Sequence, residues 1–269
     1  MEQPSWAPDG VDYDRPSPAR VYDAQLGGFH NFAVDREVAR RITGMMPDLP
    51  AILRANRSFL RRAVHFLVDA GMTQFLDLGS GIPTVGNVHE IARQANPDCR
   101  VVYVDVDPVA VAHAEALLAG DDRTLAVQAD LRRPEQIMSD RRVRALLDFD
   151  RPMGVLLVAV LQFVSDADDP AGLVARYLNA VVPGSYLVIS HGSQEGAAPR
   201  RAEEATAAYS RAVTDFWLRT RAEVSGFFAG TDLVEPGVVY LTEWRPDAPE
   251  DVGEDPSRMS TFAGVGRKN

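Results

Sequence analysis

Three aspartates lie at or just beyond the ends of three apolar, β-rich segments of this 269-residue chain. They are Asp77, Asp105 and Asp130. Carboxylates at the tips of neighbouring strands can accept hydrogen bonds from ribose hydroxyls and from the exocyclic amine of adenine. Because no lysine accompanies these acids, the set favours a neutral or cationic nucleoside over a polyphosphate. Asp105 or Asp130 alone is more often a helix N-cap, whereas the ordered set of three is far more specific.

The first of these segments leads into a glycine-rich turn, Gly79-Ser80-Gly81. Glycines there let the backbone approach a ligand closely, and Asp105 follows at about the 20-residue spacing of a ribose-binding acid. Thr84 stands where a dinucleotide fingerprint has its third glycine, which disfavours nicotinamide or flavin binding. The chain has neither a phosphate-binding loop nor a Gly-x-Ser-x-Gly nucleophile elbow. The pattern therefore predicts an adenosyl-binding site.

The net charge of the chain is −10, from 38 acidic and 28 basic residues. This balance argues against a broad nucleic-acid surface and against a polybasic membrane surface, although arginines at 132–133 and 141–144 leave a local macromolecular contact open. Cys99 is the only cysteine, so no internal disulfide or cysteine zinc site is expected. No cluster of histidines and acids has metal-ligand spacing, and we expect no metal.

Residues 1–18 are acidic, rich in proline and without an apolar stretch, which predicts a loose arm and not a signal peptide. The longest apolar run, residues 153–161, is far shorter than the ~18 residues that a membrane helix needs. We therefore expect a soluble, cytoplasmic protein. The length of the chain suits one large α/β domain after the arm, over residues 19–269.

Apolar strands alternate with amphipathic helices, which predicts a parallel sheet covered on both faces, with its ligand beyond the carboxyl ends of the strands. Expected strands cover residues 74–78, 101–104, 125–128, 155–160 and 186–190. Expected helices cover residues 35–46, 52–70, 85–95, 108–119, 134–149, 170–182 and 199–220. A capping box at Thr220 and Glu223 predicts one more short helix, to Phe228. Segments 238–243 and 259–265 are expected to form an antiparallel pair at one edge.

The run Asp77-Leu-Gly79-Ser-Gly81, the acid at Asp105 and Ala129-Asp130-Leu131 together resemble class I S-adenosylmethionine-dependent methyltransferases. Further motifs resemble one actinobacterial S-adenosyl methyltransferase family, formerly a domain of unknown function. They are Arg20-Val-Tyr22-Asp23, Leu26-Gly-Gly28, Asn31-Phe32, Asp35-Arg36, Arg54-Ala-Asn56-Arg57-Ser-Phe59-Leu60, Pro183-Gly-Ser185, Ser190-His191, Trp244-Arg-Pro246 and Ala263-Gly-Val-Gly-Arg-Lys268. The likeness covers nearly the whole chain from about Pro18.

The resemblance implies an α/β, Rossmann-like fold. Its seven-stranded sheet is mostly parallel, with the last strand antiparallel, helices on both faces and extra N-terminal helices. Within the domain, residues 19–71 would form a helical cap or lid, 72–192 the cofactor-binding half, and 193–269 the substrate-side helices and closing strands. The implied cofactor is S-adenosyl-L-methionine, and the product made from it is S-adenosyl-L-homocysteine.

The resemblance also implies which residues contact the methionine part of the cofactor. Gly79, Ser80 and Gly81, next to Asp77, would pass under it, and the Ala159 carbonyl would accept from its ammonium. The planar guanidinium of Arg57 suits its carboxylate. Arg57 could equally lie on a solvated helix face.

The adenosine part of the cofactor would contact the tips of the next two strands. Asp105 would bind the ribose hydroxyls, with Val106 or Asp107 beside the adenine. Asp130 and Leu131 would meet the adenine edge.

The acceptor pocket is expected above the strand tips, between residues 20–32, the turn with Gln162 and Phe163, and the segment from His191 to Phe216. His191 is the best-placed candidate base, because an unperturbed histidine pKa lies near 6.5. The alternative is a strand-end histidine bonded to a loop.

Tyr22, His30 and Phe32 flank a Gly-Gly hinge and are candidate lid residues, although Tyr22 could equally be a core anchor. A sulfonium already activates its methyl group, so alignment and exclusion of water are the main tasks left to a protein. A general base is needed only when the acceptor atom is protonated.

The predicted function is methyl transfer by in-line displacement to an unidentified, small-molecule acceptor. A protein that binds S-adenosylmethionine for regulation or partner binding would share the same residues, so this alternative stays open. A nicotinamide oxidoreductase is disfavoured by Thr84. From the resemblance we expect a homodimer, and no nucleic-acid or membrane partner.

Overall fold

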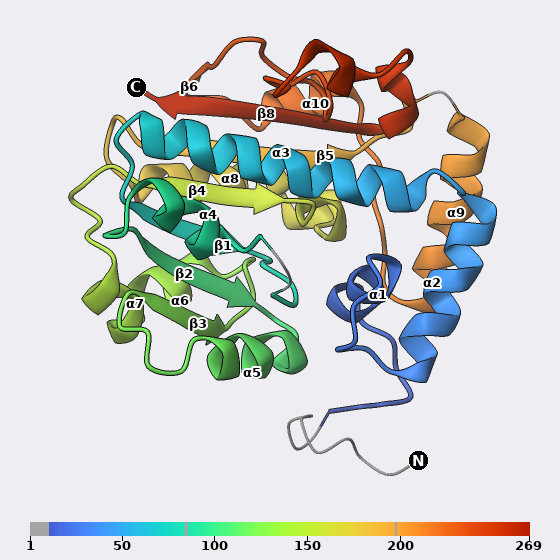
Figure 1. The fold of residues 1–269 in the computed structure, drawn as a ribbon, viewed down its shortest axis with the longest axis horizontal. Helices are drawn as coiled ribbons and strands as arrows, with labels where there is room; N and C mark the ends of the chain where they lie inside the picture. Colours follow the sequence, from blue (N-terminus) through green and yellow to red (C-terminus); the bar gives the residue numbers. More distant parts are fainter. Residues whose placement is uncertain (1–10, 84–85, 197) are drawn as a thin grey trace.

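The protein is built around an eight-stranded sheet with strand order β3-β2-β1-β4-β5-β8-β6, and β7 pairs with β8 (Figure 1). This computed structural model describes residues 11–83, 86–196 and 198–269. Strands β1 to β5 are parallel, and β8 runs antiparallel to its neighbours. The strands are β1 (Gln74–Leu78), β2 (Arg100–Asp105), β3 (Thr124–Gln128), β4 (Gly154–Val158), β5 (Tyr186–Gly192), β6 (Thr231–Leu233), β7 (Val239–Tyr240) and β8 (Thr261–Lys268).

Helices cover both faces of this sheet, which confirms the predicted Rossmann-like class. Apolar residues of α3, α4 and α5 pack on one face. Those of α6, α7, α8 and α10 pack on the other. The helices are α1 (Pro18–Gln25), α2 (Ala33–Met45), α3 (Leu49–Asp69), α4 (Val88–Ala95), α5 (Pro108–Leu117), α6 (Pro134–Ser139), α7 (Arg141–Leu146), α8 (Pro170–Asn179), α9 (Pro199–Ala212) and α10 (Arg221–Gly226). None of the helices in the described ranges is long and apolar enough to cross a membrane.

The two largest errors in helix extent concern the helices expected at 134–149 and 199–220. The helix expected at 134–149 is divided at Asp140, which has extended backbone and caps α7 by accepting from the Arg142 N–H. The helix expected at 199–220 ends at Ala212. Beyond it, backbone N–H groups bind other parts of the fold, because Trp217 donates to the Gln162 carbonyl and Arg219 to that of Gly192.

The predicted edge pair is confirmed, since β7 and β8 are antiparallel neighbours. However, the strand expected at 238–243 is reduced to the two-residue β7, and β6 was not predicted. The additional strand β6 explains why the sheet has eight strands, where the resemblance implied seven. The capping box is confirmed, because the Thr220 N–H donates to Glu223 Oε2 and the Glu223 N–H to Thr220 Oγ1.

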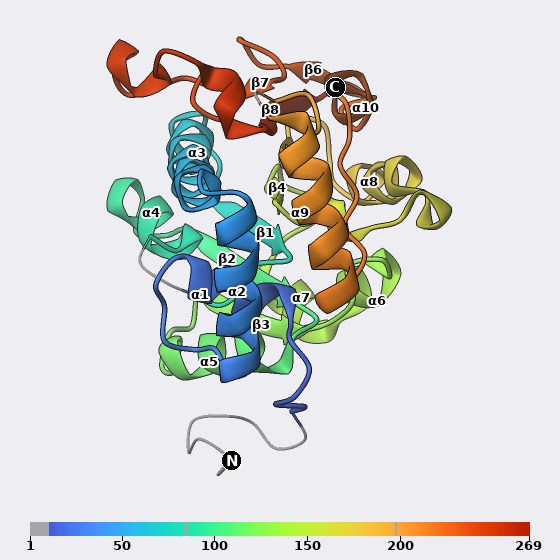
Figure 2. The ribbon, with the colours of Figure 1, turned by 90° about the vertical axis from the view of Figure 1, so that its right-hand side faces the viewer.

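Three further helices stand beyond the carboxyl ends of the parallel strands. Figure 2 shows α2 beside α9, although they are far apart in sequence, and α1 packs against α2. Val21, Val38 and Ile42 of the N-terminal helices share one apolar cluster with Ala205 and Tyr209 of α9. Helix α1 was not predicted; Ser17 caps it and Pro18 opens it. Residues 1–10 of the expected loose arm lie outside the described residues. The same holds for Val85, the first residue of the helix expected at 85–95.

Candidate functional site

A cavity of about 710 Å³ lies at the carboxyl ends of the parallel strands, within the range of small-molecule sites. Most of the predicted cofactor and acceptor residues line this cavity, and three of them do not. Those on the wall are Tyr22, Arg57, Asp77, Gly79, Ser80, Gly81, Asp105, Val106, Asp107, Asp130, Leu131, Ala159, Gln162 and Phe163. His30, Phe32 and His191 are not among its lining residues. Thr84 lies outside the described residues.

The glycine turn passes directly under the cavity. Gly79 has a φ of +73°, and a Cβ there would collide with the side chain of Val160. The N–H groups of Gly79 and Ser80 both donate to the Val104 carbonyl, at 2.8 and 3.1 Å. Gly81 has a φ of +67° and open space where a Cβ would lie. The turn therefore presents backbone to the cavity, as its glycines predicted.

Asp105 holds this turn to the start of α5. Its Oδ2 accepts from the Gly81 N–H at 2.7 Å, and its Oδ1 accepts from the Asp107 N–H at 2.9 Å. Burial raises the pKa of Asp105 to about 6, against the opposing effect of these hydrogen bonds. The Val106 N–H also donates to this carboxyl, and a carboxylate has about four acceptor positions, so at least one remains for a ligand hydroxyl. Asp105 is not a helix N-cap, because Asp107 caps α5.

Asp77 is a buried carboxylate on the cavity wall. Burial raises the pKa of Asp77 to about 7; the Arg57 charge lowers it and the Asp105 charge raises it. No group in the described ranges donates a hydrogen bond to this carboxylate, which suits it to a cationic ligand. Arg57 is half-buried and donates to the Gly86 carbonyl at 2.7 Å, so it does not lie on a solvated helix face.

Asp107 and Asp130 have protein partners beside the cavity. Asp107 Oδ1 accepts from the Val109 N–H at 2.8 Å, which makes this residue a helix cap. Asp130 accepts from the Arg132 backbone N–H and side chain, at 2.9 and 2.7 Å. These hydrogen bonds hold the pKa of Asp130 below its usual value. Part of the acceptor capacity of both carboxylates is therefore already used.

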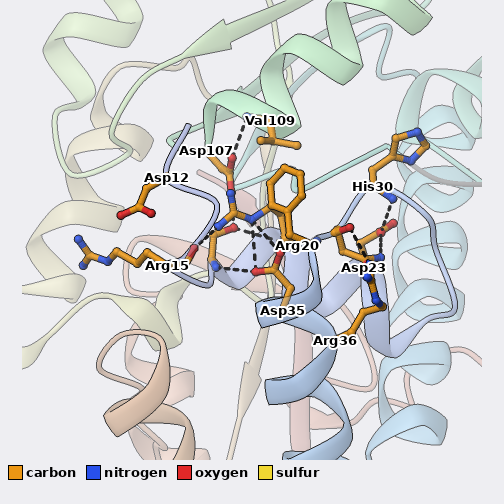
Figure 3. A network of polar contacts seen from close by, with 12 residues as sticks. Asp12, Arg15, Arg20, Asp23, His30, Asp35, Arg36, Asp107 and Val109 are labelled. Atoms are coloured by element: carbon orange, nitrogen blue, oxygen red, sulfur yellow. Dashed lines mark hydrogen bonds and ion pairs between the residues drawn. The ribbon is translucent and has the colours of Figure 1, made fainter. Parts of the chain in front are cut away.

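A buried polar network holds the N-terminal residues across the cavity (Figure 3). The Asp35 carboxylate accepts from the N–H groups of Ser17 and Phe32, at 3.1 and 2.8 Å, and forms an ion pair with Arg20 at 3.1 Å. The Ser17 hydroxyl donates to Asp107 of the opposite wall. The expectation of a loose arm up to residue 18 was therefore wrong for its described part, which links α2 to α5.

The three predicted lid residues have different surroundings. The Tyr22 hydroxyl accepts from Asn56 Nδ2 at 3.2 Å, and burial raises its pKa. Phe32 is buried under the Arg20 guanidinium, 4.9 Å from the ring centroid. The His30 ring lies against His113 of α5, with their centroids 3.5 Å apart. Tyr22 alone of the three lines the cavity.

His191 does not lie at the cavity, which corrects its predicted role as a base. The side chain is fully buried, with Nδ1 at 2.8 Å from the Gly192 carbonyl and Nε2 at 2.8 Å from Arg219 Nη1. Burial lowers the pKa of His191 to about 4, so the ring is neutral at physiological pH. Nδ1–H donates and Nε2 accepts, which leaves no nitrogen for an acceptor molecule. The histidine is bonded to a loop, the alternative that the sequence had left open.

The turn after β4 joins the two sides of the cavity. Ala159 has a φ of +55°, and its N–H donates to Ser190 while its carbonyl accepts from Gln162 Nε2 at 2.9 Å. Gln162 Oε1 is buried and has no hydrogen-bond partner in the described ranges. The Ala159 carbonyl, which was predicted to accept from the methionine ammonium, therefore already accepts one hydrogen bond from Gln162.

Sequence reasoning missed several parts of the wall. Asn56 donates to Tyr22 and accepts from Ser190 Oγ at 2.6 Å, although only its motif had been noted. Ile52 lies on a helical stripe that had been interpreted as core alone. The apolar spacing of that stripe is the same for a core face and for a cavity wall.

Comparisons with known proteins agree with these motifs. A family model described as S-adenosyl methyltransferase matches residues 4–269. A Thermobifida fusca YX protein with a provisional assignment as a methyltransferase is 42% identical, with 99% of this chain and 100% of that chain covered and a TM-score of 0.92. A DUF574 family protein from Streptomyces avermitilis MA-4680 is 39% identical, with coverage of 96% and 99% and a TM-score of 0.91. No curated protein matches the chain significantly.

Proposed function

Because the chain belongs to the S-adenosyl methyltransferase family, we propose that it transfers the methyl group of S-adenosyl-L-methionine to a small-molecule acceptor held in the same cavity. The observation that carries this proposal is the position of Asp77, Asp105 and the glycine turn on one wall of that cavity. The cavity continues past them to α2 and α9, which supports a second ligand beside the cofactor.

The described residues fit the cofactor at both of its ends. Asp77, a buried carboxylate without a hydrogen bond from the described residues, suits the methionine ammonium. Asp105 keeps at least one acceptor position for the ribose hydroxyls beyond those used by Gly81, Val106 and Asp107. Arg57, whose guanidinium has five N–H donors, suits the methionine carboxylate. We propose that Val106 and Leu131 border the adenine, with Asp130 accepting from its amine.

When bound, S-adenosyl-L-methionine supplies a methyl group, and the electron pair of the broken carbon–sulfur bond stays on sulfur. A lone pair of the acceptor forms the new bond to the methyl carbon, and any proton displaced from the acceptor passes to water. The residues of the chain position the two reactants. Gly79 allows a close approach, and Gln162 and Phe163 border the acceptor. Alignment of this kind contributes up to ~7–11 kcal/mol to a reaction between two bound molecules. No step in this proposal uses His191.

Calorimetric titration of the wild-type protein tests the proposal directly. We expect micromolar binding of S-adenosyl-L-methionine and S-adenosyl-L-homocysteine. We expect no heat of binding when NAD is titrated, because the glycine turn does not match a pyrophosphate-binding fingerprint. Absence of adenosyl binding would overturn the proposal. Adenosyl binding without transfer of a labelled methyl group to any of a broad small-molecule panel would instead favour a binding protein without catalysis.

The two buried acids predict a pH dependence for this binding. Burial raises the pKa of Asp105 to about 6 and that of Asp77 to about 7, so both carboxyls are largely protonated near pH 5. The ionised forms attract the cationic cofactor, so its affinity should increase as the pH rises from about 5.5 to 8, with protons released near pH 6.5. Titrations in two buffers with different ionisation enthalpies measure both effects. A dissociation constant that is constant over this range would contradict the assigned contacts.

A further inference from the structure

The wall of the cavity has two chemically different parts. The part around the glycine turn includes the charged side chains of Asp77, Asp105 and Arg57. The opposite part is built by α2, α9 and residues 213–218, and it lies beyond the carboxyl ends of the strands (Figure 1). We call this part, together with Phe163, the aromatic chamber. Its lining residues are Ile42, Phe163, Ala202, Ala205, Thr206, Tyr209, Val213, Thr214, Phe216 and Leu218.

These described lining residues of the aromatic chamber are all uncharged. Tyr209 does not alter this, because burial raises its pKa and keeps the phenol neutral. A charged group moved from water into such surroundings loses hydration without gaining a counter-ion. The chamber is therefore suited to an uncharged ligand.

Three rings of the chamber form one cluster. Phe163 lies 5.4 Å from Phe216 and 6.1 Å from Tyr209, measured between ring centroids, and Tyr209 lies 5.4 Å from Phe216. The two contacts of Phe216 are edge-to-face, with interplanar angles of 87° and 67°. Aromatic walls in such arrangements pack a flat ring by stacking or by edge contacts. The cluster thus favours an aromatic ligand over a branched aliphatic one.

Gln162 adds one polar group at the edge of the chamber, next to Phe163. Its amide orientation is determined by Nε2, which donates to the Ala159 carbonyl at 2.9 Å. The opposite atom, Oε1, is a buried acceptor without a partner in the described part of the chain. The main-chain carbonyl of Gln162 is also bound, because it accepts from the Trp217 N–H at 2.8 Å. A buried acceptor in this state gains free energy when a ligand donates to it.

We propose that the methyl acceptor is an uncharged, flat aromatic molecule with one hydrogen-bond donor, a hydroxyl or amino group. Its ring packs on Phe163, Tyr209 and Phe216, and its donor binds Gln162 Oε1. This inference rests on the proposed function, because it places the acceptor beside the proposed cofactor site. It goes further by stating the chemical class that the chamber selects.

A set of matched bicyclic ligands tests this class by binding alone, with the protein saturated by S-adenosyl-L-homocysteine. The probes are 2-naphthol, its saturated analogue 2-decalol, naphthalene, which lacks the hydroxyl, and 6-hydroxy-2-naphthoate, which keeps the hydroxyl free and adds a carboxylate. We expect 2-naphthol to bind about tenfold more tightly than naphthalene or 2-decalol, and the carboxylate to bind more weakly than 2-naphthol. Equal binding of 2-naphthol and 2-decalol, or tighter binding of the carboxylate, would overturn the proposed class.

Variants test the individual contacts. Gln162→Leu should reduce the affinity for 2-naphthol about tenfold and leave that for naphthalene unchanged, whereas Phe216→Leu should weaken both. Phe29→Leu is the matched control, because Phe29 is 87% exposed and outside the cavity wall. Equal losses of both ligands in Gln162→Leu would refute the hydrogen bond. If Gln162→Leu fails to fold, the wild-type comparison of 2-naphthol with naphthalene still decides the point.

The outcome separates this inference from the proposed function. Tight binding of S-adenosyl-L-homocysteine with no binding of 2-naphthol would overturn the aromatic acceptor alone. Loss of adenosyl binding in the wild-type protein would overturn both proposals. Methyl transfer from labelled S-adenosyl-L-methionine to 2-naphthol, and not to naphthalene, is the expected catalytic counterpart.

Discussion

Asp105→Ala is expected to weaken the binding of S-adenosyl-L-methionine by at least about 100-fold. Its carboxylate accepts from Gly81 and Asp107, and in our proposal it also accepts from the ribose hydroxyls. A hydrogen bond to a charged group contributes about 1.5–3 kcal/mol, so losing the ribose contacts and loosening the glycine turn together exceed the 2.7 kcal/mol or so of a 100-fold change. Calorimetry at about pH 8, where the carboxyl of the wild-type protein is ionised, measures the effect.

The control for this variant is Asp122→Ala, because the Asp122 side chain is 95% exposed and does not line the cavity. The dissociation constant of Asp122→Ala for S-adenosyl-L-methionine should equal that of the wild-type protein. Thermal unfolding of both variants shows whether the fold is kept. An Asp105→Ala protein that is folded and binds the cofactor as tightly as the wild-type protein would remove Asp105 from the site.

Arg219→Met is expected to lower the free energy of unfolding by about 3 kcal/mol. The buried guanidinium donates to the carbonyls of Leu161 and Val164 at 3.1 and 2.9 Å, to Asp166 Oδ1 at 2.7 Å, and to His191 Nε2 at 2.8 Å. A methionine fills similar space but leaves the Val164 carbonyl and the His191 ring nitrogen without a donor, whereas the Leu161 carbonyl keeps the Val164 N–H. Urea denaturation, with the transition midpoint and slope compared with the wild-type protein, measures the loss.

The effect of Arg219→Met on binding should be unequal. Arg219 holds the turn that carries Gln162 and Phe163, so we expect acceptor binding to fall more than adenosyl binding. Arg200→Met is the control, because its side chain is 91% exposed, and we expect a change in the free energy of unfolding within about 0.5 kcal/mol. A loss in Arg219→Met no larger than in this control would show that the buried guanidinium is not needed for the fold.

The local patterns of the sequence predicted most of the sheet. Strand β1 has the predicted bounds, and β2 and β3 are each within two residues of them. These strands are short apolar runs between strong turn and helix signals, so local chemistry alone defines them. The helix expected at 199–220 was wrong because its last part is extended, and its backbone N–H groups bind distant carbonyls. Such long-range partners leave no periodic signal.

Within the candidate site, too, residues set by local spacing could be predicted, and residues set by long-range contacts could not. Gly79, Gly81 and Asp105 could be predicted because parallel strands bring their carboxyl ends to one edge of a sheet, so their spacing determines their proximity. His191 could not be judged in this way. Its position just after the expected strand 186–190 predicted a base at the cavity, whereas His191 lies within β5 and Arg219, 28 residues later, binds the ring.

The fold class, the glycine turn and the acids at the strand tips follow from the amino-acid sequence, because they depend on local propensity and on the regular geometry of a parallel sheet. Which side chains form the aromatic chamber depends on how distant segments pack together. Phe163, Tyr209 and Phe216 belong to three separate segments, and their meeting depends on how α9 packs against α2. The environments of Gln162 and His191 likewise depend on the tertiary structure, because Trp217 and Arg219, which bind them, are distant in the chain.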